Sequence, residues 1–180
     1  RGLGDVFKRQ LVHSLAYADT QDLSKTFSET LRDGFNKAME ISAYSLLPLA
    51  KGVIPMMHKR GGGSIVSMSF IGSTLAVPNY NVMGPAKAAL ESCTRYLARE
   101  LGPENIRINS LSPGAIRTLS SAGIKDISEM IRVAGEHSAM KRTATQAEVA
   151  NTAAFLLSDA ASGITGQLIY VDCGYSIMAN

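Results

Sequence analysis

Residues 64–111 read SIVSMSFIGSTLAVPNYNVMGPAKAALESCTRYLARELGPENIRINSL, and this stretch decides the fold. Its first seven residues, Ser64–Phe70, form a short apolar run of the kind found in buried strands. From Val82 to Leu101 the apolar residues follow helical spacing, and Gly102-Pro103 ends the pattern. Ile106–Leu111 (IRINSL) is a second strand-like run. A strand, a helix and a strand in this order indicate a βαβ unit with parallel strands.

The same alternation continues on both sides of this unit. Leu11–Ala18 (LVHSLAYA) and Leu168–Asp172 (LIYVD) read as further buried strands, and Thr30–Lys59 and Gln146–Leu157 carry helical spacing. The sequence therefore predicts an α/β fold, a doubly wound parallel sheet of the Rossmann type.

Two segments are expected to be less regular. Pro48 and Pro55 should kink or divide the helix predicted over Thr30–Lys59. Residues 117–140 are polar and rich in Ser, Ala and Met with weak periodicity, which predicts a mobile flap of short helices.

The start of the chain does not fit a complete nucleotide-binding fold. Such folds place a Gly-rich turn after their first strand, whereas Gly61-Gly62-Gly63 precedes a strand. Residues 1–10, RGLGDVFKRQ, closely resemble a peptide, GLGDVYKRQ, that arises when sequencing-adapter DNA is read as coding sequence. We expect residues 1–10 to be non-native read-through, and residues 11–180 to be the carboxy-terminal two-thirds of a Rossmann-type domain without its amino-terminal nucleotide-binding half.

Composition narrows the function classes. The chain has 180 residues, 46% hydrophobic, which is ordinary for one soluble domain, and its net charge of +3 is interspersed, so nucleic acid is not an expected partner. Cys93, Cys173 and the three histidines lack disulfide or metal-ligand spacing, so we expect no metal and a cytoplasmic location. No stretch reaches the roughly 18 apolar residues that span a bilayer, so no membrane is expected either.

Tyr80 and Lys87 are the candidate catalytic pair. They are seven residues apart, and two helical turns return such residues to nearly the same face, about 10 Å apart along the axis. A phenol can donate a hydrogen bond to a developing oxyanion, and an ammonium can assist it and hold ribose hydroxyls. In isolation such a pair is more often a half-buried tyrosine and a solvated lysine, so its context decides.

That context is a family resemblance. Four segments resemble, in family order, signature segments of the NADH-dependent enoyl-acyl-carrier-protein reductases, a divergent branch of the short-chain dehydrogenases/reductases: Val12–Ala18 (VHSLAYA), Pro78–Leu90 (PNYNVMGPAKAAL), Ile106–Leu119 (IRINSLSPGAIRTL) and Gly163–Gly174 (GITGQLIYVDCG). Most of the wider superfamily has lysine four positions after the tyrosine, where this chain has Gly84. The Tyr-x6-Lys spacing is typical of the enoyl-reductase branch.

The resemblance implies a function and a role for each site residue. The activity would be NADH-dependent reduction of trans-2-enoyl-acyl-carrier-protein thioesters in fatty-acid biosynthesis. Tyr80 would hydrogen-bond the thioester carbonyl and Lys87 would bind the nicotinamide ribose. NADH would deliver hydride to the β-carbon, and the resulting enolate would be protonated at the α-carbon. The other implied site residues are Ser14 and Leu15 on the adenosine and ribose side of the cofactor, Ile116 and Thr118 at the nicotinamide amide and the pyrophosphate, and Phe70 and Met83 with Tyr80 in the substrate pocket.

The resemblance also implies partners for the protein. At three positions, however, the sequence differs from the family pattern. Acyl carrier protein would present the substrate, and the intact enzyme would be a homotetramer with the helix of the Tyr80/Lys87 pair in its interface. Phe70 stands where many members have tyrosine, Pro113 where alanine is usual, and Cys173 where a small residue is usual. None of the three departures falls on Tyr80 or Lys87.

Two alternatives stay open. A short-chain dehydrogenase/reductase acting on a carbonyl, of the 3-ketoacyl reductase type, would use Ser67, thirteen residues before Tyr80, as a hydroxyl partner, but Gly84 disfavours it. A catalytically inactive binding subunit of the same fold is the other, because fold does not dictate function. Ser14 and Thr118 could each be simple capping residues.

Overall fold

A four-stranded parallel sheet organises the part of the chain that the computed structural model describes, residues 9–118, 121 and 126–179. The strands lie side by side in chain order: β1 (Gln10–His13), β2 (Gly63–Met68), β3 (Ile106–Pro113) and β4 (Leu168–Val171). Parallel strands need crossover connections, which the helices provide.

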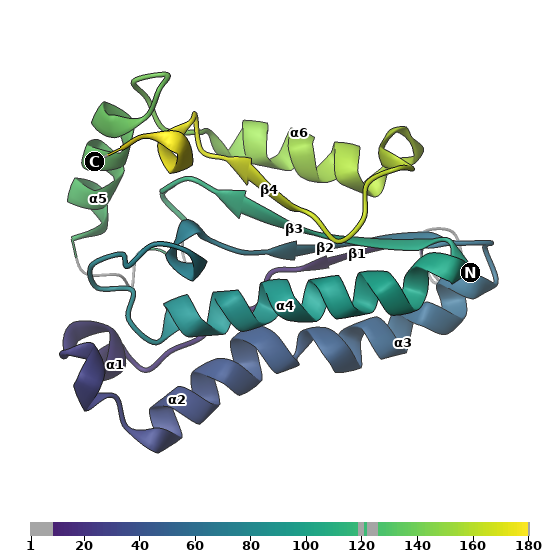
Figure 1. Ribbon diagram of the computed structural model, residues 1–180, viewed down its shortest axis with the longest axis horizontal. Helices are drawn as coiled ribbons and strands as arrows, with labels where there is room; N and C mark the ends of the chain where they lie inside the picture. The colour runs from purple at the N-terminus through teal and green to yellow at the C-terminus, as the bar shows by residue number, and fades with distance from the viewer. Residues whose placement is uncertain (1–8, 119–120, 122–125, 180) are drawn as a thin grey trace, which may run out of the picture.

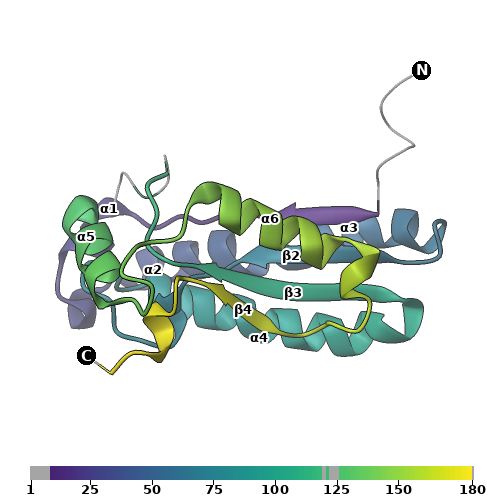
Figure 2. The same ribbon diagram turned by 90° about the horizontal axis from the view of Figure 1, so that it is seen from above.

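Helices cover both faces of this sheet, which makes the fold doubly wound (Figures 1 and 2). On one face lie α2 (Arg32–Met39), α3 (Leu46–His58) and α4 (Met83–Leu101), and on the other lies α6 (Gln146–Leu157). Helices α1 (Thr20–Ser24) and α5 (Ile127–His137) lie beyond the carboxyl ends of the strands. The predicted α/β architecture with a parallel sheet is confirmed.

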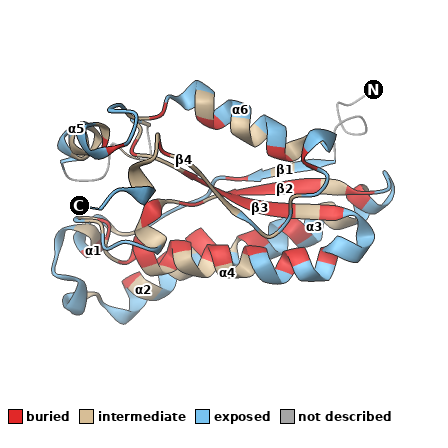
Figure 3. Cartoon of the chain, turned by 45° about the horizontal axis from the view of Figure 1, so that its top comes forward, coloured by how far each residue is buried: buried red, intermediate tan, exposed pale blue. Residues whose placement is uncertain are grey.

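Burial follows the position of each strand in the sheet (Figure 3). The central strands β2 and β3 are buried over most of their length, and their register pairs Ile65 with Ile108 and Met68 with Leu111. The outer strands β1 and β4 are more exposed. This is why the central strands read as continuous apolar runs: both of their faces are covered.

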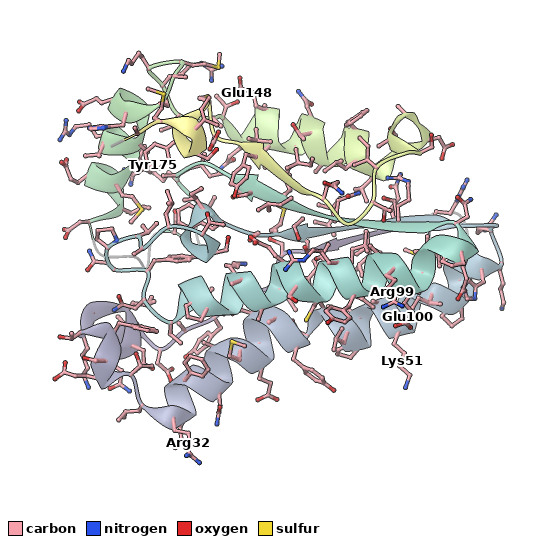
Figure 4. The ribbon with its side chains drawn as sticks, viewed as in Figure 1. Arg32, Lys51, Arg99, Glu100, Glu148 and Tyr175 are labelled. Carbon is pink, nitrogen blue, oxygen red and sulfur yellow. The ribbon has the colours of Figure 1, made fainter. Side chains whose placement is uncertain are left out.

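Two apolar cores lie on the two faces of the sheet. The larger core packs α3 and α4 against β2 and β3 through residues such as Leu46, Leu90 and Ile108, each with no exposed surface. The smaller core packs α6 against the opposite face through Val66, Leu111 and Leu156. The exposed charged residues Lys51 of α3 and Arg99 and Glu100 of α4 project away from the sheet (Figure 4). The helical periodicity of the sequence therefore reports real burial.

The first strand is shorter than expected. We predicted a strand over 11–18, but β1 ends at His13. The reason is that a side chain takes up the backbone groups that a longer strand would use. The Ser42 hydroxyl accepts a hydrogen bond from the Tyr17 amide at 2.9 Å and donates one to the Tyr17 carbonyl at 3.1 Å. Residues 14–18 are therefore drawn toward the helices.

The long helical segment divides at a place other than its prolines. A π-helical turn, Glu40–Tyr44, separates α2 from α3, upstream of both Pro48 and Pro55. Pro48 is the third residue of α3, where an amide has no partner inside the helix, and Pro55 lies within α3 without ending it. The expected division exists, but the prolines do not cause it.

One further expectation needs adjustment, and another remains a prediction. Where short helices were predicted over 117–140, α5 is a regular helix of 11 residues, and residues 119–120 and 122–125 lie outside the described part. Of the segment expected to be read-through, residues 1–8 also lie outside the described part, while Gln10 begins β1 and pairs with Ser64. Within the described residues, we find no helix both long and apolar enough to cross a membrane.

Both ends of α6 are held by polar contacts. At its start Thr145 and Glu148, the latter labelled in Figure 4, form a capping box. At its end Arg107 of β3 donates to the carbonyl oxygens of Leu156 (2.9 Å), Ser158 (2.9 Å) and Ile164 (3.2 Å). One guanidinium thus satisfies the carbonyls of Leu156 and Ser158 at the end of α6 and that of Ile164 in the segment after it.

Replacing Arg107 by methionine should therefore lower the free energy of unfolding by about 2 kcal/mol, because half-buried carbonyls lose a charged donor. Urea unfolding followed by circular dichroism measures this, and Arg107→Lys should recover part of the loss. The matched control is Arg99→Met on the exposed side of α4, expected to change stability by less than about 0.5 kcal/mol. If the two methionine variants lowered the free energy of unfolding equally, the hydrogen bonds of Arg107 would not be the source of the stabilisation.

Candidate active site

The turn before α4 presents Tyr80 to the carboxyl ends of the strands. Asn79 and Asn81 flank it with φ of 60° and 36°, a left-handed conformation that asparagine tolerates better than most residues. The Asn81 side-chain amide also donates to the main-chain carbonyls of the α1 segment, those of Asp22 (3.2 Å), Leu23 (3.2 Å) and Lys25 (2.7 Å). The turn and α1 are therefore fixed to each other.

Close packing orients the Tyr80 ring. A Cβ atom on Gly72 would lie 2.4 Å from Cδ1 of Tyr80, so this position must be glycine for the ring to fit. The ring also contacts Phe70, with centroids 4.8 Å apart and planes tilted by 56°. Tyr80 is 7% exposed, so its hydroxyl has few directions available.

Lys87 is a buried cation held by the end of β2. It lies near the start of α4, is 5% exposed, and its Nζ donates to the Met68 carbonyl oxygen at 2.7 Å. One helical turn later Glu91, also buried, accepts a hydrogen bond from the Ser69 hydroxyl at 2.5 Å. The adjacent residues Met68 and Ser69 are therefore hydrogen-bonded to two charged residues of α4, one to Lys87 and the other to Glu91.

A cleft of about 450 Å³ lies at the ends of the strands and is lined by both Tyr80 and Lys87. Of the site residues predicted from the sequence, seven line it: Ser14, Phe70, Tyr80, Met83, Lys87, Ile116 and Thr118. Leu15 does not line it, and its side chain is 47% exposed. The cleft lies where ligands of open α/β sheets bind, beyond the carboxyl ends of the strands.

The cleft changes the proton affinity of its two catalytic candidates. Burial lowers the pKa of Lys87 to about 8, and the nearby Glu91 carboxylate opposes this shift. Burial raises the pKa of Tyr80 above its usual range, and the Glu91 charge raises it further. At neutral pH both side chains therefore carry a proton that they can donate.

His13, at the end of β1, is a further titratable group beside this pair. It is 1% exposed, and its Nε2 lies 2.8 Å from the Ser45 hydroxyl, which donates to the Ile41 carbonyl. The ring must therefore donate through Nε2, which leaves Nδ1 as the unprotonated nitrogen. Nδ1 is buried and has no hydrogen-bond partner among the described residues. Burial first, then the Lys87 charge, lower the pKa of His13 below 6.5.

Ser67 and Gly84 bear on the carbonyl-reducing alternative. Ser67 has no exposed surface and lies in a closed triangle of hydroxyls with Thr94 (3.1 Å) and Ser110 (2.8 Å), away from the cleft. A Cβ atom on Gly84 would lie 2.8 Å from the Gly72 carbonyl oxygen, so lysine does not fit there without movement. The Ser67 hydroxyl does not line the cleft, and position 84 has no room for a lysine, so the two residues expected of a carbonyl reductase are not available.

The cleft also contains residues that were not among the predicted site residues. Ser69 and Tyr17 line the cleft, and Ile127 and Met130 of α5 close one side of it. Glu91, buried beside the cleft, could have been noticed in the sequence as a charged residue on the apolar face of α4. The sequence of α5 has no comparable feature that would place it at the cleft. Thr118 is engaged locally, since its hydroxyl accepts from the Ser121 amide at 3.0 Å, as an N-cap does.

Known proteins share this fold and sequence. The family model described as "Enoyl-(Acyl carrier protein) reductase" matches residues 9–176. The enoyl-[acyl-carrier-protein] reductase [NADH] FabI of Synechocystis is 53% identical over 168 residues, covering 93% of this chain and 64% of that protein. The [NADPH] enzyme of Staphylococcus aureus is 48% identical, covering 91% and 63%. The crystal structure of enoyl-(acyl-carrier-protein) reductase from Anaplasma phagocytophilum in complex with NAD superposes with a TM-score of 0.90 at 39% identity, covering 95% and 64%.

The fold and the Tyr-Lys cleft define a Rossmann-type domain of the short-chain dehydrogenase/reductase class. Within that class, the chain belongs to the enoyl-(acyl carrier protein) reductase family. It spans about 64% of the length of the Synechocystis and Anaplasma proteins.

The buried state of His13 predicts a pH dependence of stability. Because its folded pKa is below 6.5, the unfolded chain binds a proton first as the pH falls. The stabilising contribution of the neutral ring is therefore complete above about pH 6.5 and is lost as the pH falls through the folded pKa. Urea unfolding from pH 8 down to about pH 5 should show a smaller decline for His13→Gln than for the unchanged chain, while His58→Gln serves as the exposed control. Identical slopes for all three proteins would contradict this role of His13.

Proposed function

We propose that this chain carries the active site of an NADH-dependent enoyl-thioester reductase, which reduces trans-2-enoyl chains on acyl carrier protein in fatty-acid biosynthesis. One observation carries the proposal: a buried phenol and a buried ammonium line the same cleft at the strand ends, and they come from Tyr80 and Lys87 with the spacing of this family. The names of the Synechocystis and Anaplasma relatives support the reaction and the cofactor.

The residues of the cleft fit a nicotinamide dinucleotide. Lys87 offers a buried cation that could bind the ribose hydroxyls, and Ile116 and Thr118 line the cleft after β3, where the nicotinamide amide and the pyrophosphate would lie. Ser14 and Leu15, after β1, would contact the adenosine and ribose side. When bound, the reduced nicotinamide supplies the hydride. We propose NADH, although the S. aureus relative is named for NADPH.

Tyr80 would act on the substrate carbonyl. When hydride reaches the β-carbon of an enoyl thioester, negative charge develops on the carbonyl oxygen, and the phenol would donate a hydrogen bond to it. The raised pKa of Tyr80 keeps its proton in place for this task. The Lys87 charge would add electrostatic stabilisation, while Phe70 and Met83 form apolar walls that exclude water and strengthen both interactions.

We also propose the partners of this family for the intact protein. Acyl carrier protein would present the thioester, and a homotetramer would bury surface on the α4 side. Tyr96 of α4 and Tyr44 before α3 support such an interface, because they are 73% and 59% exposed. Both cysteines, Cys93 and Cys173, are free thiols, which fits the proposed cytoplasmic location.

The test uses a chimera in which residues 9–180 follow the amino-terminal part of the Synechocystis relative. It should oxidise NADH with a crotonyl thioester, measured as loss of absorbance. Tyr80→Phe should lower kcat by about 10² to 10³, the usual effect of losing an oxyanion donor, and Lys87→Met should mainly raise the KM for NADH. Lys51→Met makes the same lysine-to-methionine change at an exposed site and should behave like the unchanged chimera.

Two other results would redirect the proposal. Turnover of a 3-ketoacyl thioester without enoyl reduction would favour the carbonyl-reducing class. Binding of NADH without turnover of either thioester would favour an inactive binding subunit.

A second prediction concerns Phe70, whose ring packs on Tyr80. If Phe70 is an apolar wall, Phe70→Tyr in the chimera should change kcat/KM by less than about tenfold, roughly 1.4 kcal/mol of barrier. If a tyrosine at this position were the required proton donor, the chimera would be nearly inactive and Phe70→Tyr would raise kcat/KM by several orders of magnitude. That result would refute Tyr80 as a sufficient oxyanion partner.

A further inference from the structure

A buried carboxylate lies behind the cleft. Glu91 is 6% exposed, on the face of α4 that packs against the end of β2, and it does not line the cleft. Burying a carboxylate costs free energy unless hydrogen bonds or an opposite charge compensate it. Its Oε1 accepts from the Ser69 hydroxyl at 2.5 Å, which supplies one compensation.

The opposite charge is supplied by Lys87, one helical turn earlier. The Lys87 ammonium donates to the Met68 carbonyl oxygen, and Met68 precedes Ser69 in the chain. The end of β2 therefore holds the cation and the carboxylate through adjacent residues. With both side chains tied to one short piece of backbone, their separation is fixed by the fold.

The other groups around Lys87 are neutral or hold their protons at neutral pH. From β1 comes His13, whose pKa burial and Lys87 lower, and from the turn before α4 comes Tyr80, whose pKa burial raises. Strands β2 and β3 present the hydroxyls of Ser67 and Ser110 to α4. Among the described residues, Glu91 is the carboxylate whose charge acts on both Lys87 and Tyr80.

We propose that Glu91 is a positioning residue whose carboxylate, fastened to Ser69, keeps the buried Lys87 protonated and directed into the cleft. It acts through Lys87, because it does not line the cleft. A structural residue that merely accepts the Ser69 hydrogen bond would serve equally well as a neutral glutamine, and this difference makes the two roles separable. The benefit to catalysis rests on the proposed function, but the effect on Lys87 does not.

The test measures Lys87 in the 180-residue chain itself. The rate of acetylation by trace acetic anhydride, determined for each lysine by peptide mass spectrometry between about pH 6 and about pH 10, reports the fraction of neutral amine. Lys87 lines the cleft, so the small reagent can reach it. The unchanged chain should give a midpoint near pH 8 for Lys87. Glu91→Gln should lower this midpoint by about one pH unit, because the opposing charge is lost while the acceptor for Ser69 remains.

Matched variants separate charge from hydrogen bonding. Ser69→Ala removes the bond but keeps the carboxylate, and Glu91→Asp keeps the charge, so both should leave the Lys87 midpoint within about 0.3 pH units of the unchanged chain. The exposed Lys51 is the internal control and should label alike in all variants. The proposal is overturned if Glu91→Gln leaves the midpoint unchanged, or if Ser69→Ala lowers it as far.

A folding defect would also give an answer. If Glu91→Gln unfolds the chain because an uncompensated ammonium is left buried, adding Lys87→Met should restore the circular dichroism spectrum. If the double variant remains unfolded, Glu91 serves packing alone and the proposal fails. In the chimera, the alkaline rise of the KM for NADH should shift with the labelling midpoint. An inactive chimera would count against the proposed function and leave the labelling result standing.

Discussion

The burial of two opposite charges of α4 against the end of β2 is the constraint on which the rest of the site depends. A lysine that is 5% exposed can remain charged when a carbonyl oxygen accepts from it and a carboxylate lies near. These conditions are met by consecutive residues, Met68 and Ser69, where β2 leaves the sheet. Because β2 is a central strand, neighbours on both sides fix its end, and the helix that carries Lys87 is fixed with it.

Close backbone approach completes the cleft around this charged pair. The absence of a side chain at Gly72 makes room for the Tyr80 ring, and the same feature at Gly84 lets α4 approach the Gly72 carbonyl. The phenol and the ammonium therefore share one cleft because two glycines allow the turn and the helix to come together. The same contacts remove the space that a lysine at position 84 would need, which separates this site from the commoner Tyr-x3-Lys arrangement.

Periodicity in the sequence predicted the elements whose burial is regular. Residues 146–157 form a helix with the predicted bounds, and α4, β2 and β3 lie within two residues of theirs. The errors lie where side chains compete with regular structure: Ser42 draws residues 14–18 out of the sheet, and a π-helical turn divides the long helix. Tyr80 and Lys87 were predicted from their spacing and the family resemblance, and both line the cleft. The pairing of Glu91 with Ser69 was not predicted, because it joins residues that are 22 positions apart.

The π-helical turn at 40–44 has a consequence for how the chain tolerates length changes. Such a turn accommodates one residue more than an α-helix needs, and here it lets Ser42 reach the Tyr17 backbone while Ser45 reaches the His13 ring. Deleting one of the two residues between Ser42 and Ser45 would convert the turn to ordinary α-helix and leave the two serines two positions apart, about 200° around the helix axis. One of the two serines would then face away from β1. Among homologous chains, insertions and deletions should therefore avoid this turn even though Glu40 and Tyr44 lie at the surface.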